Sequence, residues 1–158
     1  MIKKITFLLA ICLVSINSYS AEGAFNLLNV EARDVDKYVA VLKNNPQIFE
    51  SIGSAQAGVC ITRNGSEYDG QMFVYNVYNN LEEALGASEL YDPNKASLEI
   101  ERLRKIKFAA TFKPLVDFVP RDGFHQLFRI KLNSPAAFAE KMKEMQKAIN
   151  GGGHDIMI

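Results

Sequence analysis

The chain has 158 residues, of which 18 are basic and 18 acidic, so its formal net charge is zero. A balanced charge gives no reason to expect a protein that binds nucleic acid or an anionic membrane surface. The length suits one domain of ordinary size with a hydrophobic core of its own.

Residues 1–20 have the pattern of a secretory signal peptide. Two lysines precede an apolar run over residues 5–14, and the small residues Ser18 and Ser20 occupy the −3 and −1 positions of a cut before Ala21. The apolar run is too short to span a bilayer. We therefore expect a periplasmic or secreted protein with no membrane association after cleavage.

Cleavage would change the charge and the cysteine count. It removes two lysines and no acidic residue, which leaves 16 basic and 18 acidic residues and a net charge of −2. Cys60 would be the only cysteine left, so no intramolecular disulfide can form. Because Cys60 lies in an apolar run, we expect it to be buried. The bulky Ile11 before Cys12 argues against a lipid anchor there.

Apolar periodicity divides the middle of the chain into alternating strands and helices. The predicted strands are 25–32, 57–62, 71–78 and a short one at 115–119. The predicted helices are 35–42, 48–52, 81–91 and a charged one over 95–112. Asp34 and Asn80 stand where helix caps are expected, and Asn64-Gly65 is typical of a hairpin turn. The order is βαββαβ, the ferredoxin-like split βαβ pattern of an α+β protein.

The end of the chain restates its beginning in pattern. A strand over 124–132 and a helix over 136–149 capped by Ser134 match the first strand and helix after a shift of 100 positions, which places Asp34 on Ser134 and Tyr38 on Phe138. Residues 154–158 then resemble an opening strand. We therefore expect a signal peptide at 1–20, a first unit at 21–120, and a truncated, less ordered second unit of a tandem repeat at 121–158.

This arrangement resembles the dimeric α+β barrel superfamily, and within it the antibiotic-biosynthesis-monooxygenase group. The residues that carry the resemblance are Phe25–Asp34, the Tyr38–Leu42 stripe, and Phe73–Tyr78 running into Asn80–Ala84. The resemblance implies two such sheets paired face to face, by self-association or by pairing of the two repeat units. Its members include cofactor-independent oxygenases, isomerases and haem-degrading enzymes. The haem-degrading members use a tryptophan, and this chain has none.

The candidate site residues are polar strand residues expected to face away from the helices, where convergent polar groups in an apolar pocket would form a site. His125, Asn29 and Arg129 are the catalytic candidates, and histidine can exchange protons near neutral pH. Lys131 shares their expected face. The substrate-binding candidates are Glu31, Tyr75, Asn76 and Tyr78. The alternative is that these charges are solvated or pair with one another.

The sequence supports two hypotheses about function. The first is an exported module of the barrel type that binds a small apolar ligand or another protein. The second is a cofactor-independent oxygenase or isomerase acting on an apolar or aromatic molecule between paired sheets, with His125 as the base and Asn29 and Arg129 stabilising negative charge. His125 and His154 are far apart, with no ligand spacing around them. We therefore expect neither a metal nor a cofactor.

Overall fold

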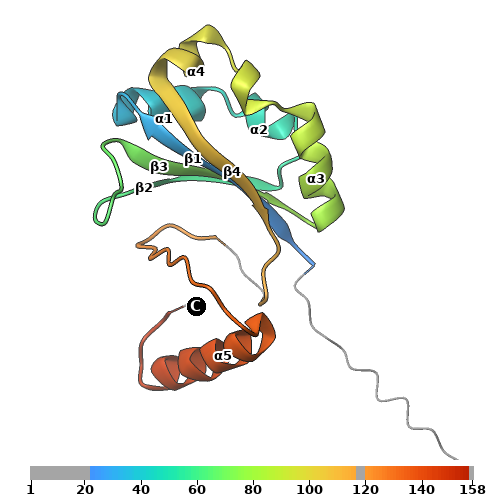
Figure 1. Cartoon of the computed structure of the whole chain (residues 1–158), viewed down its shortest axis with the longest axis vertical. Coiled ribbons are helices and arrows are strands. Elements are labelled where there is room, and N and C mark those ends of the chain that lie inside the picture. Colours follow the sequence, from blue (N-terminus) through green and yellow to red (C-terminus); the bar gives the residue numbers. More distant parts are fainter. Residues whose placement is uncertain (1–21, 117–119, 157–158) are drawn as a thin grey trace, which may run out of the picture.

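The computed structural model describes residues 22–116 and 120–156. Figure 1 shows a sheet with helices α1 to α4 on one side and the C-terminal helix α5 on the other. The strands are β1 (Ala24–Ala32), β2 (Gln56–Ile61), β3 (Gln71–Tyr78) and β4 (Arg104–Phe112). The helices are α1 (Val35–Asn44), α2 (Gln47–Glu50), α3 (Leu81–Leu90), α4 (Leu98–Leu103) and α5 (Pro135–Gly151), with a 3-10 turn η1 (Pro93–Lys95) before α4.

The four strands form one antiparallel sheet in the order β2-β3-β1-β4. The two strands that are central, β1 and β3, belong to different halves of the βαββαβ order, which is the ferredoxin-like topology. The prediction of an α+β, ferredoxin-like unit is confirmed by this topology. The expected tandem repeat gains no such support and stays a prediction.

Side-chain caps start the helices where the sequence indicated. The carboxylate of Asp34 accepts a hydrogen bond from the backbone N–H of Lys37 at 3.0 Å, and the Asn80 side chain accepts one from Glu83 at 2.8 Å. Glu83 reaches back to the N–H of Asn79 at 3.1 Å, so the start of α3 is held from both directions. Ser134 caps α5 in the same way. These local contacts explain why the helix starts were predictable.

The core lies between the sheet and α1 to α4, and it has two clusters. The larger joins Val30 and Met72 of the sheet to Tyr38 of α1 and Ile100 of α4. The smaller joins Tyr78 to α3 at one end of the sheet. Val30, Met72 and Tyr38 are fully buried. Alternation along β1 and β3 therefore sends even-numbered residues toward the helices and odd-numbered residues toward the opposite face, which we call the open face.

The long charged helix predicted over 95–112 is wrong. The chain is helical only in α4, and β4 follows from Arg104 to Phe112, paired with β1 along its whole length. The helix-facing residues of β4 change from Arg104 and Ile106 to Ala109 and Thr111 at a bulge, so the apolar residues are evenly spread when the segment is read as a helix. Strand period and pairing with β1 override helix propensity here. Lys107 is the extra residue at a bulge opposite Asn29 and Val30.

The strands predicted for the C-terminal part of the sequence also differ from the structure. Residues 124–132, predicted as a strand, are irregular and form no ladder with the sheet. Leu115 and Val116 are not in a strand, and residues 117–119 of that predicted strand lie outside the described residues. The same holds for the predicted strand at 154–158, of which 154–156 are irregular and 157–158 are not described. A strand needs a partner for its backbone groups, which sequence pattern alone does not supply.

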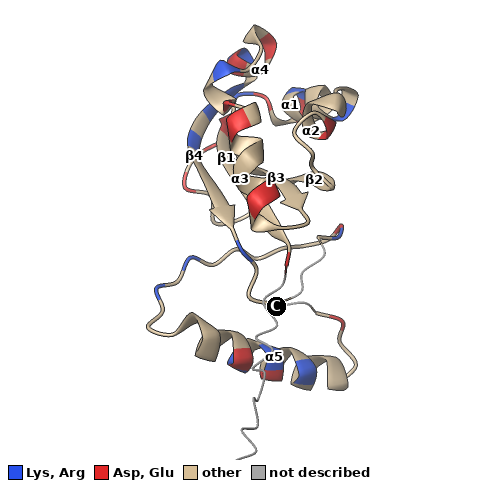
Figure 2. Ribbon diagram, turned by 90° about the vertical axis from the view of Figure 1, so that its right-hand side faces the viewer, with Lys and Arg blue, Asp and Glu red and all other residues tan. Residues whose placement is uncertain are grey.

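The segment 120–132 and helix α5 lie on the side of the open face (Figures 1 and 2). Most of the segment's side chains are exposed, including Phe124, Leu127 and Phe128. Helix α5 buries one residue, Ala139, and carries ion pairs such as Lys143–Glu140 at 2.9 Å on its exposed side. Within the described residues, no helix is long and apolar enough to cross a membrane.

Candidate functional site

A cavity of about 430 Å³ lies between the sheet and the helices that cover it. Its floor is formed by the helix-facing sides of β1, β3 and β4, and its walls by α1 to α4 and their connections. The apolar part of the lining includes Leu28, Val74, Leu42, Phe49, Ile52 and Ile100. The volume falls in the range of small-molecule pockets, which are lined mainly by apolar groups with a few fixed polar ones.

The polar part of the floor comes from two neighbouring strands. Asn26 of β1 lies directly opposite Asn76 of β3 in the sheet register, and both line the cavity. The Asn26 side chain is held in place, because its amide donates to the carbonyl of Ala84 at 2.9 Å and its oxygen accepts from Thr111 at 2.7 Å. Asn76 has no such support for its oxygen.

Two residues that line the cavity carry a buried side-chain oxygen with no hydrogen-bond partner among the described residues: Asn76 Oδ1 and the Tyr78 hydroxyl. Burial raises the pKa of Tyr78, and the nearby Asn26 side chain offsets this in part. Buried polar atoms are almost always paired with protein or water, so each unpaired one calls for an explanation. Both residues line the same cavity, so a molecule bound there is a candidate partner for these atoms.

Arg104, at the start of β4, lines the cavity with its side chain almost fully buried. Its guanidinium donates to the Tyr38 hydroxyl at 2.7 Å, to the Tyr91 hydroxyl at 2.9 Å and to the carbonyl of Pro93 at 3.0 Å. Burial works against its charged form, but the two tyrosines outweigh this and the pKa of Arg104 is raised. The guanidinium therefore stays charged inside the core.

Asn29 and Glu31 lie on the open face, as alternation predicted. Their partners are Tyr68 and Lys107, and neither residue lines the cavity. Asn29 is 2% exposed because Tyr68, from the loop between β2 and β3, covers it and donates to its side-chain oxygen. Glu31 forms an ion pair with Lys107, whose ammonium also lies 4.4 Å from the centre of the Tyr68 ring. The bond to Lys107 lowers the pKa of Glu31.

The three substrate-binding candidates of β3 are divided between the two faces. Tyr75 lies on the open face, and Asn76 and Tyr78 point toward the helices. The grouping of all three on one open-face site is therefore wrong, because neighbouring strand residues alternate. Burial raises the pKa of Tyr75, whose ring lies over Gly58 of β2.

The structure does not bring His125 or Arg129 to the cavity. His125 is exposed, and its Nε2 atom lies 2.8 Å from the carbonyl oxygen of Arg121. The guanidinium of Arg129 lies 5.3 Å from the centre of the Phe108 ring, on the open face. Lys131 is exposed. None of the three lines the cavity, so no catalytic set with Asn29 is assembled around it.

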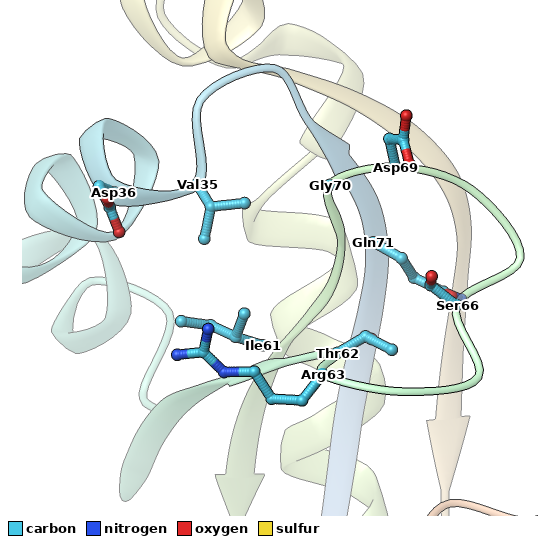
Figure 3. Close-up of a pocket in the computed structure, with 9 residues that line it drawn as sticks. All are labelled: Val35, Asp36, Ile61, Thr62, Arg63, Ser66, Asp69, Gly70 and Gln71. Carbon is cyan, nitrogen blue, oxygen red and sulfur yellow. The ribbon is translucent and has the colours of Figure 1, made fainter.

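A second hollow of about 350 Å³ lies beside the β2–β3 loop and the start of α1 (Figure 3). Its polar side chains do not converge: Arg63 extends toward the side of Asp36, and Ser66 and Gln71 lie together on the other side. Within residues 22–116 and 120–156, no group of three or more histidine, cysteine or acidic side chains could hold a metal ion. The cavity under the helices is therefore the better candidate site.

Sequence reasoning missed Asn26 and Arg104 as site residues. Asn26 could have been found, because it shares the β1 face of Leu28 and Val30. Arg104 was hidden by the helix predicted over 95–112. Once residues 104–112 are read as a strand, Arg104 falls opposite Ala32 on the helix-facing side.

No family model matches the chain, and no curated protein does. Among solved structures, it is similar to SnoaB, a cofactor-independent oxygenase from Streptomyces nogalater, with 11% identity over 64% of this chain and 100% of that one at a TM-score of 0.45. It is also similar to a dimeric ferredoxin-like protein from an uncultured marine organism, with 8% identity over 61% of this chain and 99% of that one, at a TM-score of 0.47. A third similar structure is MupZ from Pseudomonas fluorescens, with 11% identity over 87% of this chain and 93% of that one, at a TM-score of 0.32.

Proposed function

We propose that the protein binds a small, largely apolar molecule in the cavity between the sheet and the helices. The observation that carries this is that Asn76 and Tyr78, each with a buried, unpaired oxygen (Asn76 Oδ1 and the Tyr78 hydroxyl), both line this mainly apolar cavity. A ligand with a hydrogen-bonding group would satisfy them and bury its apolar part on Leu28 and Val74. The proposed site thus moves from the face between paired sheets to the opposite face of the same sheet.

Filling the cavity should abolish binding. Ala109 lies on the helix-facing side of the edge strand β4, opposite Leu28, and lines the cavity. In Ala109→Phe the aromatic ring would occupy the space that a ligand needs. We expect 2-naphthol, 2-naphthamide or 2-naphthoate to bind the wild type, measured by ligand fluorescence, and to bind this variant at least about tenfold more weakly.

The neighbouring position supplies a matched control for this variant. Ala110 is also among the residues that border the cavity, but it lies opposite Leu27, so its side chain alternates to the open face of the same strand. Ala110→Phe makes the same change in volume and should leave the affinity unchanged. If none of the three probes binds the wild type, or if both variants lose binding equally, the cavity is not the ligand site.

A cofactor-independent oxygenase or isomerase is the second candidate function. The observation that favours it is that the Tyr78 hydroxyl, an unpaired group that can donate a hydrogen bond, and the charged Arg104 belong to residues that line the same mainly apolar cavity. Such groups stabilise negative charge that develops on a substrate oxygen when a proton leaves the adjoining carbon. Because His125 lies outside the cavity, the substrate itself or another group would have to accept this proton.

Oxygen consumption would separate an enzyme from a binding protein. With anthrone as the probe, an oxygenase should consume oxygen in the presence of a metal chelator. Tyr78→Phe should then slow this rate by about 100-fold, because it removes a hydrogen-bond donor that would stabilise the developing negative charge. A wild-type protein that binds anthrone but neither consumes oxygen nor speeds proton exchange on it would be a binding protein.

The location and the assembly of the protein are further parts of the proposal. The signal pattern of residues 1–20 supports export, with a mature N-terminus at Ala21, which N-terminal sequencing of the exported protein would test. The open face supports self-association, because it carries apolar side chains from three strands: Phe25, Leu27, Phe73, Tyr75, Val77, Phe108 and Phe112. A second copy or the second repeat unit would cover them, and sedimentation of the purified chain would show which.

A further inference from the structure

The guanidinium of Arg104 is a buried charge in the wall of the cavity. The residue is 6% exposed, and its three hydrogen-bond acceptors are neutral oxygens, those of Tyr38, Tyr91 and Pro93. Arginine has five N–H donors in a planar fork. These three bonds use three of the donors, so two remain for a further partner.

The charge of Arg104 has no acidic partner in the described part of the chain. No carboxylate there lies within 4 Å of its guanidinium. Asp92 also lines the cavity, but its carboxylate accepts from the N–H of Asn94 at 2.9 Å and lies 3.5 Å from the Lys95 ammonium. A buried ion without a counter-ion is costly to the fold, so its presence beside an empty apolar space requires a reason.

The geometry points to an organic anion. We propose that the ligand of this cavity is an apolar or aromatic carboxylic acid, whose carboxylate binds Arg104 and whose apolar body lies against Leu28, Phe49 and Val74. This rests on the proposed function, since it names the class of molecule that the same cavity takes. The planar fork of arginine matches a carboxylate, and a buried, charge-assisted pair of this kind is stronger than a neutral hydrogen bond.

Two probes of nearly equal shape test the charge. 2-Naphthoate carries a carboxylate, and 2-naphthamide replaces it with a neutral amide. We expect the wild type to bind the naphthoate at least about tenfold more tightly, and Arg104→Met to lose this preference while retaining weak binding of both. Arg102→Met removes an exposed arginine from neighbouring α4 and should keep the preference.

The outcomes separate the inference from the proposal on which it rests. Equal binding of the two probes by the wild type, or a preference that survives in Arg104→Met, overturns the anion and leaves the cavity as a ligand site. If the wild type binds 2-naphthol but neither of these probes, the anion proposal fails alone; if it binds none of the three, both proposals fail. Should Arg104→Met not fold, Arg104→Lys keeps the charge without the fork and should show a reduced preference; an unchanged preference there counts against the carboxylate–fork pair.

Discussion

Gly70→Ala is expected to destabilise the fold by roughly 2–4 kcal/mol, as a lost free energy of unfolding. Gly70 precedes β3 and has a φ of +69°, a conformation that costs alanine energy. The carbonyl of Gly70 also accepts a hydrogen bond of 2.8 Å from the N–H of Ala32, at the end of β1. A Cβ at this position would overlap the backbone of Ala32, so the two central strands would have to separate.

Gly65→Ala is the matched control. It lies in the same loop between β2 and β3 and has nearly the same φ, +72°, but a Cβ there meets nothing within 4 Å. It should cost only the backbone strain, about 1 kcal/mol. Urea unfolding followed by circular dichroism measures both variants. Equal losses in the two variants would show that conformation alone matters and that the close approach to Ala32 does not.

Much of this fold could be predicted from local pattern. β1 and β3 were placed within one residue because a half-buried strand alternates, and the starts of α1 and α3 because Asp34 and Asn80 cap them. These signals lie within a few residues of the element that they define. The predictions that were wrong concern segments whose structure depends on residues far away in the sequence. Residues 104–112 become a strand because β1 offers them an edge, and residues 124–132 do not become one because they pair with no strand.

The candidate site was harder to predict, because it depends on which face of each strand is covered. Asn76 and Tyr78 were among the predicted site residues and they line the cavity, but they were assigned to the face away from the helices. The cavity exists only because α2 and α3 leave space over the sheet between two core clusters. That depends on side-chain packing between elements, which spacing along a sequence does not contain.

Tyr38→Ala should be among the most damaging substitutions in this chain, with a loss of roughly 3–5 kcal/mol in the free energy of unfolding. Tyr38 is 0% exposed and lies in the larger core cluster, where α1 packs on Val30 and Met72. Its removal would leave a cavity and would also take the hydroxyl from Arg104, which it now contacts at 2.7 Å. Burial raises the pKa of Tyr38, and Arg104 opposes this.

Tyr38→Phe separates packing from polarity, because it keeps the ring and removes only the hydroxyl. We expect it to cost about 1–3 kcal/mol, since a buried guanidinium donor loses its acceptor. Lys43→Ala, on the exposed side of α1, should change stability by no more than about 0.5 kcal/mol. Thermal and urea unfolding of the three variants would measure this order. If Tyr38→Phe were as stable as the wild type, the hydroxyl would not be needed to hold Arg104, and the guanidinium would have to draw its stability from the other groups around the cavity.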